Sequence, residues 1–137
     1  MIFMTNQNLV IQIQTHNQWF MTVSIKNIYY IPDSYVGTSP IPLMLNFHGF
    51  GGNASYFMIY ADMRAVAESN TFILGYPQGS CADGSAYWGP CPGGIDHKST
   101  IDDLGFVTCI INEISSQYIV DLERIYAAKY SNEDMMA

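Results

Sequence analysis

Basic residues are scarce in this chain: five lysines and arginines stand against twelve aspartates and glutamates, giving a net charge of −7. Binding to nucleic-acid phosphates needs a concentration of positive charge, so nucleic-acid binding is disfavoured. Charged residues of both signs make up only 12% of the chain, whereas hydrophobic residues make up 49%. This composition excludes an intrinsically disordered chain and favours one compact, sheet-rich domain.

The chain also lacks an uninterrupted apolar run that is long enough to span a membrane. Its first eight residues, M-I-F-M-T-N-Q-N, contain no basic residue and no continuous apolar core. They therefore do not form a recognisable signal peptide. The expectation is either a cytosolic protein or a chain whose natural start lies further upstream.

Cysteines are few, and their spacing excludes a structural zinc site because paired Cys/His ligands are missing. Cys81 and Cys91 flank one loop that is rich in glycine and proline. They could form a disulfide in an oxidising compartment or remain two unlinked thiols. Cys109 lies within an apolar helical pattern and is predicted to be a buried free thiol.

The pattern of apolar residues predicts the order of strands and helices. In chain order we expect strands over 9–14, 24–31 and 43–47, a helix over 57–69, a strand over 71–76, a helix over 101–118 and a strand over 125–128. The first two strands form an antiparallel hairpin in this interpretation. The later alternation indicates an α/β fold, with a mostly parallel sheet and helices on both faces.

Two features follow strands at their carboxyl ends, where ligands bind in such sheets. Segment 48–53, H-G-F-G-G-N, has three glycines in four positions, which indicates unusual backbone conformations or a close approach to a ligand. Ser131 follows the last strand, and helix-compatible residues come after it. A strand that turns through a serine into a helix is the layout of a nucleophile elbow. The alternative is that Ser131 is an ordinary helix N-cap.

Five stretches together carry a resemblance that runs from about residue 24 to the C-terminus. They are P-L-M-L-N-F-H-G-F-G-G-N (42–53), Y-P-Q-G (76–79), D-D-L-G-F (102–106), V-D-L-E-R-I-Y (120–126) and S-N-x-x-M-M-A (131–137). The chain resembles the α/β-hydrolase fold esterases of the polyhydroxybutyrate depolymerase family, which also includes feruloyl and acetyl xylan esterase-like members. The resemblance implies hydrolysis of a polyester or an acylated carbohydrate, no metal or cofactor, and an extracellular location.

The resemblance also implies roles for residues at the two strand ends. Ser131 would be the catalytic nucleophile that accepts the acyl group. The amide of Asn132 would be one oxyanion donor, and an amide of Gly49 or Phe50 would be the other.

Two further residues are placed at the substrate cleft by the same resemblance. Trp88 would line the cleft, with the alternative that it is a loop aromatic covering the core. His48 would lie beside it. The favoured interpretation of His48 is a histidine that braces the loop by hydrogen bonding, because the catalytic histidine comes last in this fold.

The end of the chain departs from the family pattern. The usual elbow is G-x-S-x-G, but Lys129 and Glu133 occupy the two glycine positions. The triad acid and histidine follow the serine in this fold, and neither fits within the six residues after Ser131. We therefore expect residues 1–137 to be one partial domain, truncated after the elbow, with little triad-dependent turnover. Its last strand, 125–128, would form an unprotected sheet edge that favours self-association.

Two other hypotheses explain the unusual residues at the end. The chain could be a degenerate, non-catalytic homologue that retains the fold and a binding cleft, which the long charged side chains at positions 129 and 133 favour. Alternatively, these residues could reflect a sequencing or gene-model error.

Overall fold

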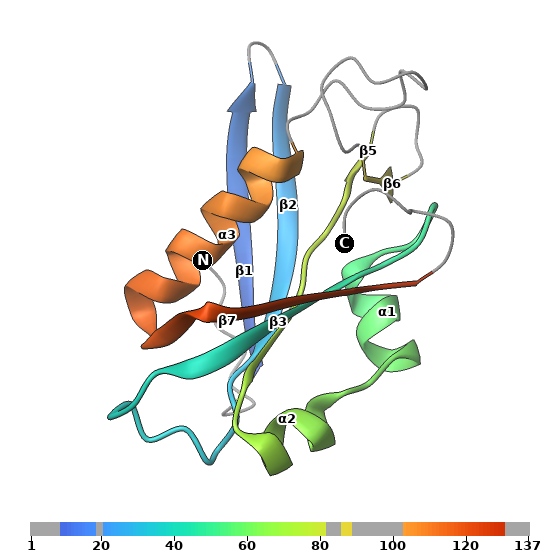
Figure 1. The fold of residues 1–137 in the computed structure, drawn as a ribbon. Coiled ribbons are helices and arrows are strands. Elements are labelled where there is room, and N and C mark those ends of the chain that lie inside the picture. Colours follow the sequence, from blue (N-terminus) through green and yellow to red (C-terminus); the bar gives the residue numbers. More distant parts are fainter. Residues whose placement is uncertain (1–8, 19–20, 82–85, 89–102, 131–137) are drawn as a thin grey trace.

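The computed structural model describes residues 9–18, 21–81, 86–88 and 103–130, which form seven strands and three helices (Figure 1). In chain order they are β1 (Leu9–Gln18), β2 (Met21–Tyr30), β3 (Ile41–Phe47), α1 (Ala54–Tyr60), α2 (Arg64–Asn70), β4 (Ile73–Tyr76), β5 (Ser80–Cys81), β6 (Ala86–Tyr87), α3 (Asp103–Gln117) and β7 (Val120–Lys129).

Five of these strands form one sheet, in the order β1-β2-β4-β3-β7. β1 pairs antiparallel with β2, which confirms the predicted hairpin, and β2 pairs antiparallel with β4. β3 lies parallel to both β4 and β7. The sheet is therefore mixed, and its parallel part is β4, β3 and β7. Strands β5 and β6 form a separate antiparallel pair.

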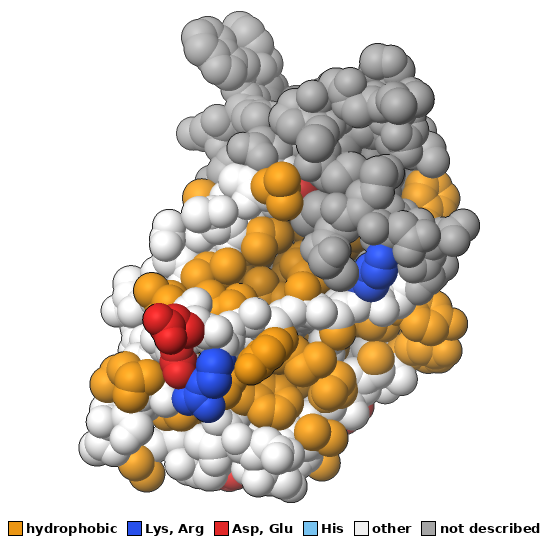
Figure 2. Space-filling model, in the orientation of Figure 1, with side chains coloured by type: hydrophobic (Ala, Val, Ile, Leu, Met, Phe, Trp, Pro, Cys, Tyr) orange, Lys and Arg blue, Asp and Glu red, His pale blue; other side chains and the backbone are white. Residues whose placement is uncertain are grey.

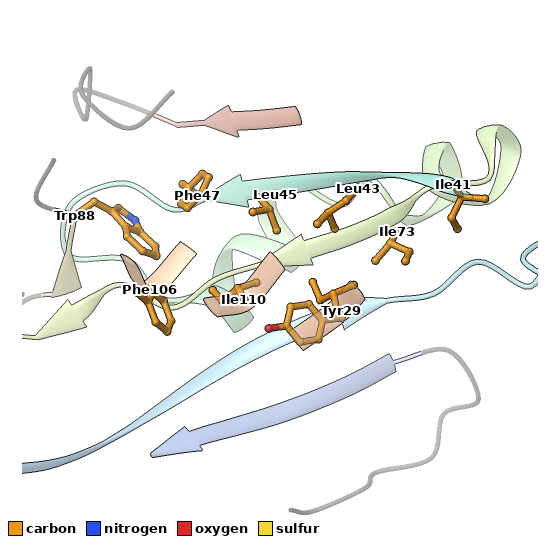
Figure 3. Packing of buried hydrophobic residues seen from close by; sticks show 10 residues of the cluster. Tyr29, Ile41, Leu43, Leu45, Phe47, Ile73, Trp88, Phe106 and Ile110 are labelled. Atoms are coloured by element: carbon orange, nitrogen blue, oxygen red, sulfur yellow. The ribbon is translucent and has the colours of Figure 1, made fainter. Parts of the chain in front are cut away.

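Helices cover both faces of the sheet, as predicted. On one face, α3 packs Phe106 and Ile110 against a row of β3 side chains that includes Leu43 and Leu45 (Figure 3). On the other face, α1 and α2 pack against side chains of β2 and β4. β3 and β4 are consequently almost fully buried, which explains why both strands read as nearly continuous apolar runs.

β7 forms one edge of the described sheet, in agreement with the expected position of the last strand. Leu122 and Tyr126 on this strand are 65% and 54% exposed. Figure 2 shows that hydrophobic side chains gather on the surface beside this edge.

The single helix predicted over 57–69 is wrong, because the chain breaks between α1 and α2. The Asp62 side chain accepts a hydrogen bond from the Arg64 backbone N–H (3.0 Å) and forms an ion pair with its guanidinium (2.6 Å). The Tyr76 hydroxyl donates to the Ala61 carbonyl (2.8 Å) and accepts from the Met63 N–H (3.2 Å). These bonds satisfy backbone groups that a continuous helix would have paired internally.

Cys109 is a free cysteine, as predicted, but the prediction that it is buried is wrong because the residue is exposed. The buried positions of α3 are Asp103, Phe106, Ile110 and Ile114, at spacings of three and four residues. Successive residues of an α-helix are about 100° apart, so Cys109 lies to the side of this buried stripe.

Candidate active site

The carboxyl ends of β3 and β7 lie side by side. Phe47, the last residue of β3, is paired with Lys129, the last residue of β7. The next residue along the chain, Tyr130, donates its N–H to the Phe47 carbonyl (3.3 Å). The segments that follow the two strands therefore begin at one rim of the sheet.

A cavity of about 310 Å³ lies at this rim. Its described lining is mainly aromatic side chains and loop backbone, and consists of His48, Gly49, Phe50, Gly52, Asn53, Tyr56, Phe57, Tyr60 and Tyr130. No charged side chain occurs among these lining residues. Such a surface suits an uncharged ligand with an apolar part.

Local backbone geometry favours glycine at two positions of segment 48–53. Gly51 has a φ of +71°, in the region that favours glycine. A Cβ atom at Gly52 would lie only 3.0 Å from the Gly49 carbonyl oxygen and 3.1 Å from Nδ1 of His48. Asn53 then ends the loop as the N-cap of α1, where its side chain accepts the N–H of Tyr56 (2.8 Å). The loop is thus tightly folded onto its own first residues.

His48 is buried, with 2% of its surface exposed, and both ring nitrogens meet backbone groups. The Gly79 N–H donates to Nε2 (2.9 Å), so Nε2 carries no proton. Nδ1 must then carry the proton, and it donates to the Gly49 carbonyl (2.8 Å). Burial lowers the pKa of His48 below its ordinary value and favours this neutral form. The arrangement agrees with the interpretation of His48 as a bracing residue.

Gln78 connects the loop to the turn after β4. Its Oε1 accepts the Ala54 N–H at the start of α1 (2.8 Å), and its Nε2 lies 3.3 Å from Nε2 of His48. Nε2 of Gln78 also donates to the Gly79 carbonyl (3.1 Å). The Gln78 backbone N–H donates to Oδ1 of Asn27 (3.1 Å). The stretches H-G-F-G-G-N and Y-P-Q-G are therefore parts of one hydrogen-bonded unit. Sequence reasoning assigned no role to Gln78, because only its place in Y-P-Q-G marks it.

Trp88 packs in the core beside this unit. It is 3% exposed, meets the Phe47 ring edge-on with centroids 5.0 Å apart, and stacks on Phe106 at 6.5 Å. Its Nε1 donates to the His48 carbonyl (3.0 Å). Trp88 is not among the described residues that line the cavity, so its role in lining a substrate cleft stays a prediction.

Tyr130 joins the end of β7 to α1 across the cavity. The Tyr60 hydroxyl donates to the Tyr130 hydroxyl (3.1 Å), and their rings meet edge-on with centroids 5.2 Å apart. This hydrogen bond raises the pKa of Tyr60 above its ordinary value. The Phe57 ring lies 6.2 Å from that of Tyr130. The end of β7 is therefore held against the helix that follows segment 48–53.

The predicted site residues fall into two groups. Gly49 and Phe50 line the cavity together with His48. Ser131 and Asn132 lie outside the described residues, although the neighbouring residue Tyr130 lines the same cavity. Cys91 also lies outside them, so its pairing with Cys81 stays a prediction.

The described part of the chain contains neither a candidate metal site nor a candidate membrane span. No group of three or more histidine, cysteine, aspartate or glutamate side chains in this part could hold a metal ion. A helix of the length and apolar character needed to cross a membrane was likewise not found there.

Solved structures with the same arrangement of strands and helices are hydrolases. An S-formylglutathione hydrolase from Agrobacterium tumefaciens superposes with a TM-score of 0.67 at 11% identity, covering 93% of this chain and 50% of that one. A poly(3-hydroxybutyrate) depolymerase from Bordetella parapertussis gives a TM-score of 0.56 at 16% identity, covering 90% of this chain and 42% of that one. The chain has the α/β-hydrolase fold.

Curated relatives of this α/β-hydrolase chain are esterases. It is 31% identical over 108 residues to feruloyl esterase B of Piromyces equi, a match that covers 77% of this chain and 19% of that protein. It is 31% identical over 114 residues to feruloyl esterase B of Thermothelomyces thermophilus, covering 82% of this chain and 38% of that protein. The match thus spans about a fifth of the length of the first relative and about two fifths of the second. No protein-family model matches it.

Proposed function

We propose that the chain is part of a serine carboxylic ester hydrolase of the polyhydroxybutyrate depolymerase type, with Ser131 as its nucleophile. The observation that carries the proposal is the cavity at the ends of β3 and β7. Segment 48–53 and Tyr130, the neighbour of Ser131, line this one space. The esterase relatives support ester chemistry.

In the proposed reaction, the Ser131 hydroxyl attacks the ester carbonyl carbon, and a general base takes its proton. The amide of Asn132 and an amide of Gly49 or Phe50 donate hydrogen bonds to the carbonyl oxygen as it becomes negative. Loss of one such donor typically costs about 100- to 1,000-fold in rate. The alcohol then leaves with the proton. Water hydrolyses the acyl-serine, which releases the acid and restores the hydroxyl.

His48 is unsuited to the role of general base. Its only unprotonated nitrogen already accepts a hydrogen bond from Gly79, and burial opposes its protonation. We infer that the acid and histidine of the triad come from residues outside these 137, so this chain by itself has little triad-dependent turnover.

The proposed substrate is a polyester or an acylated carbohydrate, and the proposed location is extracellular. An uncharged ester group suits the aromatic lining of the cavity, since no charged side chain occurs among the described residues that form it. Neither a metal nor a cofactor is needed for the proposed chemistry.

The test uses the full-length protein that carries this sequence, a p-nitrophenyl butyrate assay and a fluorophosphonate probe. We expect hydrolysis, a probe adduct on the peptide that contains Ser131, and loss of both in Ser131→Ala. The rate should fall by at least about a thousand-fold. Ser39→Ala is the matched control, because Ser39 lies in an exposed loop before β3.

The possible results separate the hypotheses. Hydrolysis that survives in Ser131→Ala would show a different nucleophile and refute the assignment. A full-length protein without hydrolysis or labelling would instead favour the non-catalytic homologue.

A further inference from the structure

We propose that Gln78 is a positioning residue of the ester-hydrolysing site, which sets the shape of segment 48–53 by holding both of its ends. This inference rests on the proposed function, in which an amide of Gly49 or Phe50 is an oxyanion donor. Gln78 itself does not touch the reacting atoms in this proposal.

The Gln78 side chain reaches both ends of the loop. His48 begins the segment, and Nε2 of Gln78 lies 3.3 Å from Nε2 of His48. Ala54 directly follows the segment, and its N–H donates to Oε1 of Gln78 (2.8 Å). The six residues of the loop are thus closed by a single side-chain amide.

The Gln78 amide has one orientation that satisfies its partners. Oε1 must face the Ala54 N–H, which is a donor, and Nε2 must face the Gly79 carbonyl, which is an acceptor. The backbone of Gln78 is anchored as well, because its N–H donates to Oδ1 of Asn27 on β2 (3.1 Å). Asn27 is 0% exposed, so this anchor lies in the protein interior.

The consequence for catalysis follows from the precision that an oxyanion hole needs. A misplacement of about 1 Å at such a site can cost about 100-fold in rate. Replacing Gln78 removes one contact from each end of the loop at once, while His48 keeps its bonds to Gly79 and Trp88 and the cavity lining loses no group. We therefore expect a fall in kcat of about 10- to 100-fold, with KM changed by less than about three-fold.

Gln78→Glu provides a signature that a general loss of stability would not give. The variant keeps the acceptor for Ala54 but places a carboxylate oxygen beside Nε2 of His48. The groups that face His48 among the described residues are the Gly49 carbonyl, the Gly79 N–H, the Gln78 amide and the Trp88 ring, none of which titrates. No titrating group among these described neighbours would offset the new negative charge. The charge would therefore raise the pKa of His48 from its lowered native value.

The experiment has a spectroscopic arm and a kinetic arm. In the full-length protein labelled with ¹⁵N-histidine, we expect His48 as the neutral Nδ1–H tautomer, titrating below its ordinary value of about 6.5. In Gln78→Glu its pKa should rise. In the full-length protein, Gln78→Glu and Gln78→Met should both lower kcat with KM nearly unchanged. Gln117→Glu, at the exposed end of α3, is the matched control for both arms.

The outcomes distinguish the two proposals. Absence of Ser131-dependent hydrolysis in the unmodified protein would overturn the proposed function and the positioning role with it. An active protein whose Gln78 variants keep native kcat, or lose only substrate affinity, would overturn the positioning role alone. So would a Gln78→Glu chain in which His48 titrates as in the native chain.

Discussion

Removing the hydroxyl group of Tyr76 tests the account of the break between α1 and α2. Tyr76 is fully buried, and its hydroxyl bonds the Ala61 carbonyl at 2.8 Å and the Met63 N–H at 3.2 Å. Tyr76→Phe keeps the ring and its edge-on contact with Phe57, whose centroid is 6.1 Å away. Both backbone groups at the junction then lose this partner.

The expected cost follows from these two hydrogen bonds. A buried polar group left without a partner costs about 1–3 kcal/mol, and water can partly replace the hydroxyl because the junction is only partly buried. We expect Tyr76→Phe to lower the free energy of unfolding by about 2 kcal/mol, which corresponds to a fall in Tm of roughly 6–10 °C. Urea unfolding of the chain followed by circular dichroism measures this difference.

Tyr29→Phe is the matched control on the opposite face of the sheet. Tyr29 is 1% exposed, yet its hydroxyl has no hydrogen-bond partner among the described residues. Its removal should leave the free energy of unfolding within about 0.5 kcal/mol of the native value or increase it. Equal losses in the two variants, or a loss below about 0.5 kcal/mol for Tyr76→Phe, would refute the reasoning.

Two further predictions concern packing and exposure. Gly75→Ala should lower the free energy of unfolding by about 1–3 kcal/mol, because the added Cβ would lie 2.7 Å from Cδ2 of Leu45 in the core. Urea unfolding measures this difference. An unchanged free energy of unfolding would show that Leu45 moves aside freely. The exposed Cys109 thiol should react with Ellman's reagent in the folded chain, and Cys109→Ser should reduce the rapidly reacting thiol by one equivalent per chain. A Cys109 that reacts only after unfolding would contradict its position on α3.

The sequence predicted the order of the five main-sheet strands and of α3, because periodicity and strand burial are local properties, but it missed the short pair β5 and β6. β3 and β4 read as continuous apolar runs since helices cover both of their faces. The helix break at Asp62 was missed because Tyr76, fourteen positions further along the chain, supplies part of its hydrogen bonding. The burial of Cys109 was misjudged because an apolar pattern does not show which side of the helix meets the sheet.

The juxtaposition of the ends of β3 and β7 was predictable, but the hydrogen bonds that shape segment 48–53 were not. In a parallel sheet the carboxyl ends of neighbouring strands lie at the same edge, so the segments that follow β3 and β7 should begin close together. The pairing of Phe47 with Lys129 confirms that the two strands end side by side. The hydrogen bonds of Gln78 to His48 and Ala54 could not be predicted, because they join residues 30 and 24 positions apart. Such contacts depend on how closely the ends of β3 and β4 approach, which a single sequence does not encode in any local pattern.

The hydrogen bonds of His48 also affect the energetics of any ligand that enters the cavity. They anchor segment 48–53 to the turn after β4 from within the protein, before a ligand arrives. The conformational entropy of these residues is therefore lost when the protein folds and not when a ligand binds. A ligand then keeps more of its interaction energy as affinity. In the proposed function this would make the loop a preorganised receptor, whose backbone amides should keep nearly the same directions in the empty and occupied protein.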